Sequence, residues 1–176
     1  MQWPPRPGPG LGGHCIPIDP HYLSWKLKTL DYEARFIQLA GEVNTNMPNH
    51  ILKLISSNLN KLHKSLNGSK ILIIGVAYKK NVDDIRESPA LDIIRLLEDN
   101  GAKVDYHDPY VPDFQVDEES IKRSIQLTSK SIQKYCLVVV VTNHSCFDYK
   151  MIQDSAHLVF DTRNSFEEPF ETLARL

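Results

Sequence analysis

The order of apolar and polar residues divides the chain into a helical first part and a second part that alternates between strands and helices. From about Pro20 to Leu66, apolar residues recur at the spacing of one helix face, with an interruption near Asn46–Pro48. Asp19 followed by Pro20 is typical of an N-cap and a first-turn proline. The stripe resumes and runs to a glycine-containing end at 67–69, through Ile51, Ile55, Leu59, Leu62 and Leu66. One helix cannot bury such a stripe alone, so the pattern predicts packing on the following domain or on a second copy of the chain.

After residue 70, short apolar runs rich in β-branched residues alternate with helical segments. The sequence predicts a helix that Ser88 caps and Pro89 opens, and it places Val104 and Tyr106 on one side of a strand. A further helix is expected around 147–154, and residues 120–129 are ambiguous. The predicted strands lie in KILIIGVAY, AKVDYHDPY, CLVVVVTNH and HLVFDTRN. This alternation predicts an α/β fold, a Rossmann-like doubly wound parallel sheet, whose ligands bind beyond the carboxyl ends of the strands. We divide the chain into a cysteine loop (1–19), a helical region (20–68) and the sheet domain (69–176).

Composition excludes several classes of function. Of 176 residues, 41% are hydrophobic and 24% are charged, which is ordinary for a globular protein, and the formal net charge is −2. No basic stripe is present to neutralise a nucleic-acid backbone, and the longest apolar run is too short to cross a bilayer. The first residues lack the apolar core of a secretory signal. Three cysteines without regular spacing indicate reduced thiols, so we expect a cytoplasmic protein without a disulfide framework or a metal site.

The stretch PGPGLGGHCIPIDPHYL places Cys15 in a glycine-rich loop. Such a loop lets backbone amides close around a ligand and presents the thiol at a tight turn. The fingerprint G-x-G-x-x-G, by which a Rossmann unit binds a dinucleotide, is absent after the first strand, where only Gly75 appears. Cations could hold a phosphate there instead, at Lys79, Lys80 and Arg86, or these could be solvated loop charges. Asp108 could bind a ribose, although Pro109 favours a role in a turn.

Four motifs together carry a resemblance to a known family. They are the cysteine loop, GVAYKKNVDDIRESPALDII, YHDPYVP and FDTRN, in this order. The chain resembles the nucleotide-sugar 6-dehydrogenases, the UDP-glucose/GDP-mannose dehydrogenase family, from about Pro7 to its C-terminus. His14 and Ile18 stand where the UDP-glucose branch has serine and lysine, so the loop is more similar to the UDP-N-acetylhexosamine branch, with N-acetylglucosamine or N-acetylmannosamine substrates.

The resemblance implies a reaction and a set of site residues. Family members oxidise the C6 alcohol of a UDP-sugar to a carboxylate with two molecules of NAD, and they dimerise through a central helical region. Cys15 matches the nucleophile that forms a thiohemiacetal and then a thioester, and Asp19 matches the acid/base residue. Arg86 matches a cofactor contact. The residues that match the substrate-binding segment and contacts are Arg6, Pro7, Gly8, Pro9, Gly10, Leu11, Gly12, Tyr78, Lys79 and Arg163.

The chain also departs from the family: it begins near the end of the family's second third, so we expect the NAD-binding domain to be absent from it. We therefore expect no turnover of a nucleotide sugar by this chain alone. The first hypothesis is a C-terminal portion of such a dehydrogenase, which is functional only as part of a longer enzyme. The second is a non-catalytic module for UDP-sugar binding or dimerisation. The third is a cysteine hydrolase that pairs Cys15 with His14 or His21, although no orienting third group is identifiable. Cys136 and Cys146 have no assigned role. For Arg163 the alternative is a salt bridge near the C-terminus.

Overall fold

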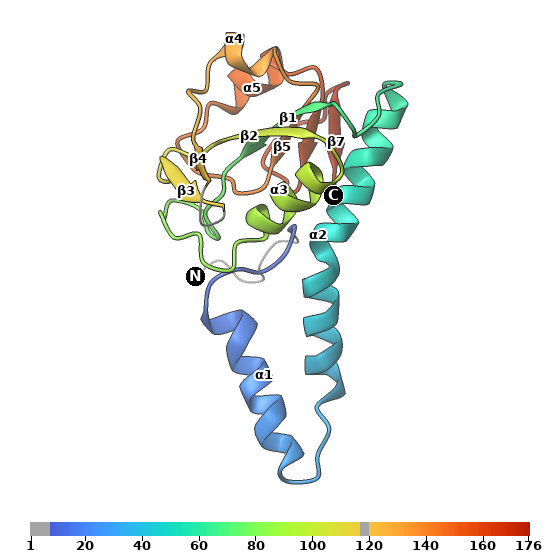
Figure 1. The fold of residues 1–176 in the computed structure, drawn as a ribbon, viewed down its shortest axis with the longest axis vertical. Coiled ribbons are helices and arrows are strands. Elements are labelled where there is room, and N and C mark those ends of the chain that lie inside the picture. The colour runs from blue at the N-terminus through green and yellow to red at the C-terminus, as the bar shows by residue number, and fades with distance from the viewer. Residues whose placement is uncertain (1–7, 117–119) are drawn as a thin grey trace.

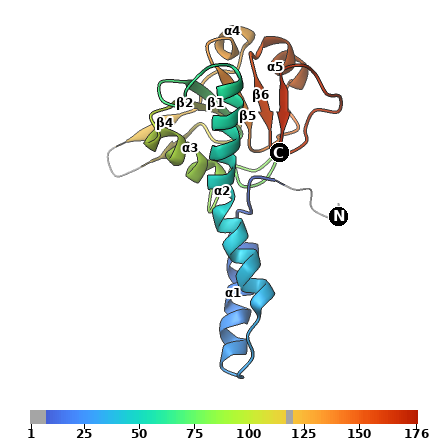
Figure 2. The ribbon, with the colours of Figure 1, turned by 90° about the vertical axis from the view of Figure 1, so that its right-hand side faces the viewer.

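A computed structural model describes residues 8–116 and 120–176 of the chain. Two helices, α1 (Cys15–Lys28) and α2 (Arg35–Lys61), form a hairpin that extends away from an α/β domain (Figure 1). The second half of α2 runs along that domain, and its first half continues beyond it beside α1 (Figure 2). Residues 8–14, which precede α1 and which we call the glycine loop, pack against the same domain.

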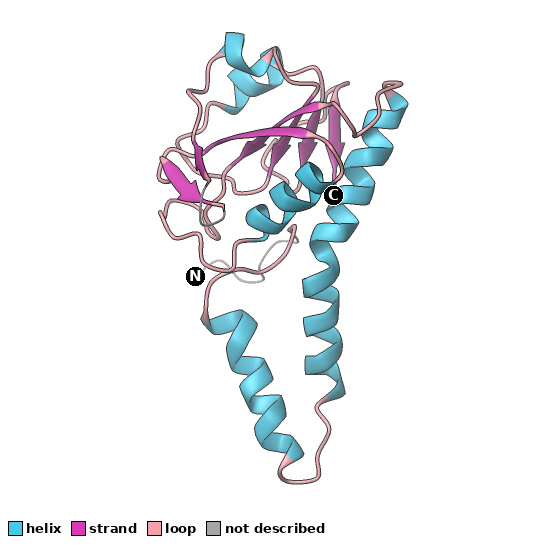
Figure 3. Ribbon diagram, in the orientation of Figure 1, coloured by secondary structure: helices cyan, strands magenta, loops and turns pink. Residues whose placement is uncertain are grey.

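The centre of the α/β domain is a five-stranded sheet in the order β2-β1-β5-β6-β7, in which every neighbouring pair is parallel (Figure 3). A short antiparallel pair, β3 (Asp113–Gln115) and β4 (Ile121–Arg123), lies outside this sheet and includes part of the segment that was ambiguous from sequence. The five strands are β1 (Lys70–Ile74), β2 (Lys103–His107), β5 (Leu137–Val140), β6 (Val159–Asp161) and β7 (Leu173–Arg175).

Helices cover both faces of the sheet, as the doubly wound prediction requires. Alternate residues of β1 and β5 point to opposite faces, and because both faces are covered, the two central strands are apolar throughout. Ile71, Ile73 and Val139 pack with residues of α2 and of α3 (Pro89–Asp99). Leu72 and Val138 pack on the other side with residues of α4 (Ser129–Ile132) and α5 (Tyr149–Ser155). The predicted fold class is therefore confirmed.

Local sequence signals placed α3 and β2 correctly. The Ser88 hydroxyl accepts a hydrogen bond from the amide of Ala90 at 3.3 Å, and Pro89 is the first helical residue. Val104 and Tyr106 are both buried in β2, as the alternating pattern predicted.

The predicted start of the first helix was wrong. α1 begins at Cys15, its N-cap residue is His14, and Asp19 is an exposed residue inside the helix instead of its cap. Pro17 falls in the first turn, where amide groups have no partner within the helix, so a proline is accommodated there. Pro20 removes only one hydrogen bond from the helix. Two prolines therefore sit inside a segment that local rules would begin later.

The predicted interruption and end of the second helix were also wrong. α2 is continuous through Pro48, whose ring is buried, and it ends at Lys61 instead of near Leu66. Burial of this ring offsets the hydrogen bond that a proline cannot donate to the carbonyl group four residues earlier. Residues 62–64 close the helix end, because the amide of Lys64 donates to the carbonyl oxygen of Leu59 and His63 adopts a φ of 56°.

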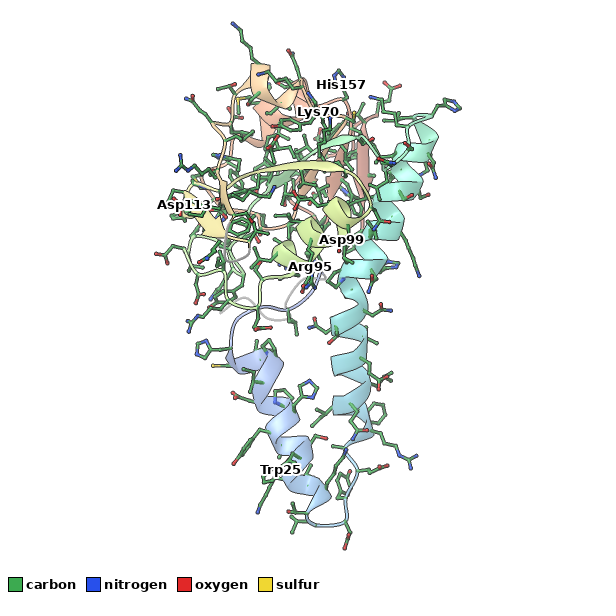
Figure 4. The ribbon with its side chains drawn as sticks, in the orientation of Figure 1. Trp25, Lys70, Arg95, Asp99, Asp113 and His157 are labelled. Atoms are coloured by element: carbon green, nitrogen blue, oxygen red, sulfur yellow. The ribbon has the colours of Figure 1, made fainter. Side chains whose placement is uncertain are left out.

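The two halves of α2 differ in what covers their apolar residues. Ile51, Ile55 and Leu59 are fully buried in the core of the α/β domain, so packing on the following domain accounts for this part of the stripe, and it is not free to bind a second copy. Exposed apolar side chains gather instead on α1 and the first half of α2, as Trp25 illustrates in Figure 4. We call this set the hairpin face: Ile16, Ile18, Tyr22, Leu23, Trp25, Phe36, Leu39 and Val43. Among the described residues, no helix is both long enough and apolar enough to cross a membrane.

Candidate functional site

The glycine loop lies at the edge of the sheet where the parallel strands end. Gly8 lies against the guanidinium of Arg163, which follows β6. A Cβ atom added to Gly12 would lie 2.6 Å from the Cβ of Tyr78, in the segment that follows β1. The opposite edge of the sheet holds Lys70, at the start of β1 (Figure 4). The loop thus occupies the edge at which Rossmann-like sheets bind their ligands.

Two hydrogen bonds anchor the loop. The amide of Leu11 donates to Oδ1 of Asn44 on α2 at 2.7 Å, and the amide of Gly13 donates to the carbonyl oxygen of Arg86 at 3.0 Å. Gly12 is sterically required, because a side chain there would also lie 2.7 Å from the carbonyl oxygen of Glu87. The loop is therefore pressed closely between α2 and the segment that precedes α3.

Arg163 is a half-buried cation without an acidic partner among the residues that the structure describes. Its Nε donates to the carbonyl oxygen of Val141 at 2.7 Å, which fixes the guanidinium and leaves the two Nη groups available. Burial lowers the pKa of Arg163. The side chain borders a cavity of about 520 Å³ that Gly8, Phe36 and Asn44 also line. This geometry offers a fixed positive group to an anion, and it does not support the alternative of a salt bridge.

Cys15 is the first residue of α1 and is exposed. Asp19 lies four residues later, so both side chains project from the same face of the helix. The helix N-terminus favours a negative charge, which suits a nucleophilic sulfur. The guanidinium of Arg86 is close enough to Cys15 for an electrostatic interaction. The pKa of Arg86 is raised mainly by the hydrogen bond to Asp84, with smaller effects of Tyr78 and Cys15.

The histidines do not complete a catalytic dyad of the hydrolase type. His21 lies six residues after Cys15, which rotates it by about 240° around the helix, and it packs against Gly41 of α2. His14 is the exposed N-cap residue and makes no side-chain capping bond. His21 therefore lies away from the thiol, and His14, although close enough to Asp84 for an electrostatic interaction, makes no described hydrogen bond that would orient its ring beside the thiol.

The remaining predicted residues divide into those that reach the loop and those that do not. Tyr78 packs against Gly12 and Gly13, and Arg163 packs against Gly8 of the same loop. Lys79 is exposed, and no described contact ties it to the loop or to Cys15. Arg6 and Pro7 lie outside the described residues.

The buried side chains of Asp108 and His144 contact each other and connect the loops that follow β1, β2 and β5. Oδ2 of Asp108 accepts from the amides of Val76 at 2.7 Å and Ala77 at 3.1 Å, and it lies 3.0 Å from Nε2 of His144. Its other oxygen accepts two amides of its own turn, at 110 and 111. Burial raises the pKa of Asp108, but the hydrogen bonds outweigh that effect, so the pKa is lowered overall. Asp108 thus has the role in a turn that Pro109 favoured.

Sequence reasoning missed Asn44 and His144. Asn44 is a single polar residue near the middle of a long helix, and only its position next to the loop gives it a role. His144 was visible only as part of TNH at the end of a strand, the signal that could have identified it.

The described residues do not fit a dinucleotide such as NAD. A Rossmann unit that binds a dinucleotide holds its pyrophosphate with open backbone amides in the glycine-rich turn after the first strand. Gly75 has a φ of 81°, but the space beside its Cα is filled by the carbonyl oxygen of Thr142. The expected cofactor contact, Arg86, forms a salt bridge of 2.6 Å with Asp84. Within residues 8–116 and 120–176, no group of three His, Cys, Asp or Glu side chains is placed to hold a metal ion.

Fold and site together define a Rossmann-like α/β domain with a glycine loop and a half-buried arginine at the edge where the parallel strands end. Two family models match the chain: the UDP-binding domain of the UDP-glucose/GDP-mannose dehydrogenase family over residues 72–168 and the central domain of that family over residues 3–46. The chain belongs to the UDP-glucose/GDP-mannose dehydrogenase family, which confirms the resemblance seen in the sequence.

Similar proteins carry related names. The chain is 37% identical over 170 residues to a UDP-N-acetyl-D-mannosamine dehydrogenase of Methanococcus maripaludis, covering 92% of this chain and 37% of that protein. It is 30% identical to a UDP-N-acetyl-D-glucosamine 6-dehydrogenase of Salmonella typhi, covering 88% and 38%. The structure of a UDP-D-ManNAc dehydrogenase from Pyrococcus horikoshii matches with a TM-score of 0.78 and 27% identity, over 96% of this chain and 38% of that one. The chain therefore spans a little more than a third of these proteins.

Proposed function

We propose that the chain binds the diphosphate and sugar of a UDP-N-acetylhexosamine and supplies Cys15 as the nucleophile of an NAD-dependent 6-dehydrogenase. The observation that carries this proposal is the half-buried guanidinium of Arg163, which has no acidic partner in the described structure. A partly desolvated cation costs free energy unless an anion joins it. A diphosphate repays this cost with charge-assisted hydrogen bonds to the free Nη groups.

The glycine loop and its neighbours supply the remaining contacts to the substrate. Without side chains, Gly8 and Gly12 allow a sugar and diphosphate to approach the backbone closely. Tyr78 forms one wall of the site, and the flexible, exposed Lys79 reaches the diphosphate as a second cation once the ligand is bound.

Cys15 then acts on an aldehyde at C6 of the sugar. Its sulfur adds to the carbonyl carbon, and the carbonyl oxygen takes up a proton, which gives a thiohemiacetal. Asp19, one helical turn away, is placed to accept or return a proton at this oxygen or at a later attacking water. Oxidation of the adduct needs a hydride acceptor, which the described residues do not hold, so we propose that this part works within a longer or two-part enzyme.

Titration calorimetry with UDP and UDP-N-acetylglucosamine tests the binding proposal. Arg163→Met should weaken UDP binding by about 30-fold, because charge-assisted hydrogen bonds contribute about 1.5–3 kcal/mol. Arg95→Met is a matched control, since Arg95 is an exposed arginine of α3 paired with Asp92 (Figure 4). Absence of UDP binding at millimolar concentration, or equal affinities of the two variants, would refute the proposal.

Thiol alkylation tests the position of Cys15. Bound UDP-N-acetylglucosamine should slow the reaction of Cys15 with iodoacetamide, as measured by peptide mass spectrometry, while Cys146 serves as the exposed control in the same chain. Equal protection of both thiols would contradict a sugar held beside Cys15.

We further propose that the hairpin face is covered in a homodimer. Large contiguous apolar patches on a protein surface mark interfaces. Light scattering of the chain and of Phe36→Glu, at a position where 88% of the residue's surface is exposed, tests this. The substitution should shift a dimer to the monomer, and a monomeric wild-type chain would refute it.

A further inference from the structure

His144 is fully buried, polar and unused in the proposed chemistry, yet both of its ring nitrogens are engaged. Nδ1 accepts a hydrogen bond from the amide of Asn81 at 2.8 Å, and Nε2 faces Oδ2 of Asp108 at 3.0 Å. An amide can only donate, so Nδ1 carries no proton, and the proton of the neutral ring lies on Nε2. The hydrogen bonds therefore define one tautomer.

The two partners of this ring hold opposite ends of one segment. Asp108 accepts from the amides of Val76 and Ala77 at its start. At its end, His144 accepts from Asn81, whose side chain also exchanges two hydrogen bonds of 2.9 Å with Ser145. The segment 76–81 thus crosses the edge of the sheet between two fixed points, and the amide of Tyr78 between them donates separately to the carbonyl oxygen of Asp84 at 2.9 Å.

Between these points lie the two residues of the segment that the proposed function assigns to the substrate. Tyr78 packs under the glycine loop, and Lys79 is exposed. Asn81 has a φ of 62°, a left-handed conformation that asparagine tolerates but that needs support. Release of the Asn81 amide would remove part of this support and let the Lys79 end of the segment move.

We propose that His144 is a positioning residue: through Nδ1 it fixes Asn81 and thereby holds Lys79 in place for an incoming diphosphate. The bond to Asp108 serves mainly to set the tautomer, because Asp108 retains four backbone amide donors without it. The part of this inference that concerns the diphosphate rests on the proposed function, whereas the anchoring of Asn81 does not.

The ring is also held by packing. Its centroid lies 4.9 Å from that of Tyr110 and 5.2 Å from that of Phe147, so a side chain of similar shape should remain in place. This allows a matched pair of variants. His144→Asn retains an acceptor at the position of Nδ1 and loses the donor to Asp108, whereas His144→Gln retains a donor near the position of Nε2 and loses the acceptor for Asn81. Each variant loses one buried hydrogen bond, so a purely structural role predicts equal effects.

Amide hydrogen exchange of the free chain tests the anchoring. His144→Gln should lower the protection of the Asn81 amide by about tenfold or more, and His144→Asn should preserve it. Equal loss of protection in both variants would overturn the inference. If either variant fails to fold, the imidazole ¹⁵N shifts of the wild-type chain decide: a proton on Nε2 supports the inference, and a proton on Nδ1 overturns it.

UDP affinity, measured by calorimetry, tests the link to binding. His144→Gln should weaken UDP binding by about tenfold, since the ligand must then order the segment itself, while His144→Asn stays close to wild type. Equal affinities of the two variants would overturn the role in binding. If the wild-type chain binds no UDP, the proposed function and the role in binding both fail, and the exchange experiment alone decides the anchoring of Asn81.

Discussion

Replacing Asp108 with asparagine removes one charge and changes one acceptor atom into a donor at the most heavily hydrogen-bonded side chain of the site. The carboxylate is only 2% exposed and accepts four backbone amides in addition to facing Nε2 of His144. The asparagine oxygen will stay where three donors converge, at the position of Oδ2. Its amide group must then face the N–H groups of Tyr110 and Val111.

The cost of the substitution follows from this count. One part-buried and one buried amide lose their acceptor, at about 1–3 kcal/mol each. We therefore expect Asp108→Asn to reduce the free energy of unfolding by about 4 kcal/mol, a large share of the roughly 5–15 kcal/mol typical of a domain. Urea denaturation followed by circular dichroism should show the midpoint shifted by about 2 M.

Asp105→Asn is the control, because Asp105 is an exposed residue of β2 that accepts a single hydrogen bond, from the hydroxyl of Tyr135 at 2.8 Å, and an amide oxygen can still accept it. A loss below about 1 kcal/mol in Asp108→Asn, or an equal loss in the control, would refute the reasoning.

The pH dependence of the free energy of unfolding gives a second check. The pKa of Asp108 is lowered in the folded chain, so its contribution is present above the unfolded value of about 3.9 and is lost as the pH falls through the folded pKa. The difference between wild type and Asp108→Asn should therefore shrink below about pH 4.

Three further predictions concern backbone strain, loop anchoring and alkaline pH. Gly75→Ala should cost about 3 kcal/mol in urea denaturation, because it combines a φ of 81° with a backbone clash, whereas Gly68→Ala, with a φ of 82° in open space, should cost only about 1 kcal/mol. Equal costs would contradict this. Asn44→Ala should weaken UDP binding by about fivefold in calorimetry, since the loop loses its anchor on α2; an unchanged affinity would argue against the anchor. Burial raises the pKa of Tyr106 and of Tyr149 to about 12. Stability measured by denaturation should therefore be intact below about pH 10 and fall as the pH rises through 12, and a flat profile would contradict the shifts.

Local rules predicted those elements in which short-range and long-range interactions agree. Ser88 and Pro89 begin α3 because the cap hydroxyl and the fixed proline angle act within one helical turn. The alternation of apolar runs with helical segments predicted the doubly wound sheet, and the burial of β1 and β5 on both faces agrees with it. The limits of α1 and α2 were wrong because Pro17, Pro20 and Pro48 interrupt local patterns, whereas packing and first-turn geometry tolerate them.

The site followed the same division. The family motifs indicated the glycine loop, Tyr78 and Arg163, and the structure brings these residues together. Asn44 and His144 form hydrogen bonds with residues 33 and 63 positions away in the sequence, so local patterns gave no signal for Asn44 and only a position after a strand for His144. A polar side chain stabilises such a loop only if it forms a hydrogen bond with one of the loop's amides. The fold determines which amide lies next to it.

α2 is continuous through Pro48, where its buried half begins, so a bend at this proline would move the exposed half of the helix relative to the α/β domain. Asn44 lies four residues before Pro48 in the exposed half, about 6 Å along the helix axis at 1.5 Å per residue. A bend of about 10° at Pro48 would displace Asn44 by about 1 Å. This displacement is enough to break the hydrogen bond of 2.7 Å between Asn44 and the amide of Leu11. A movement of the hairpin relative to the α/β domain would therefore break the hydrogen bond that holds the loop next to Cys15.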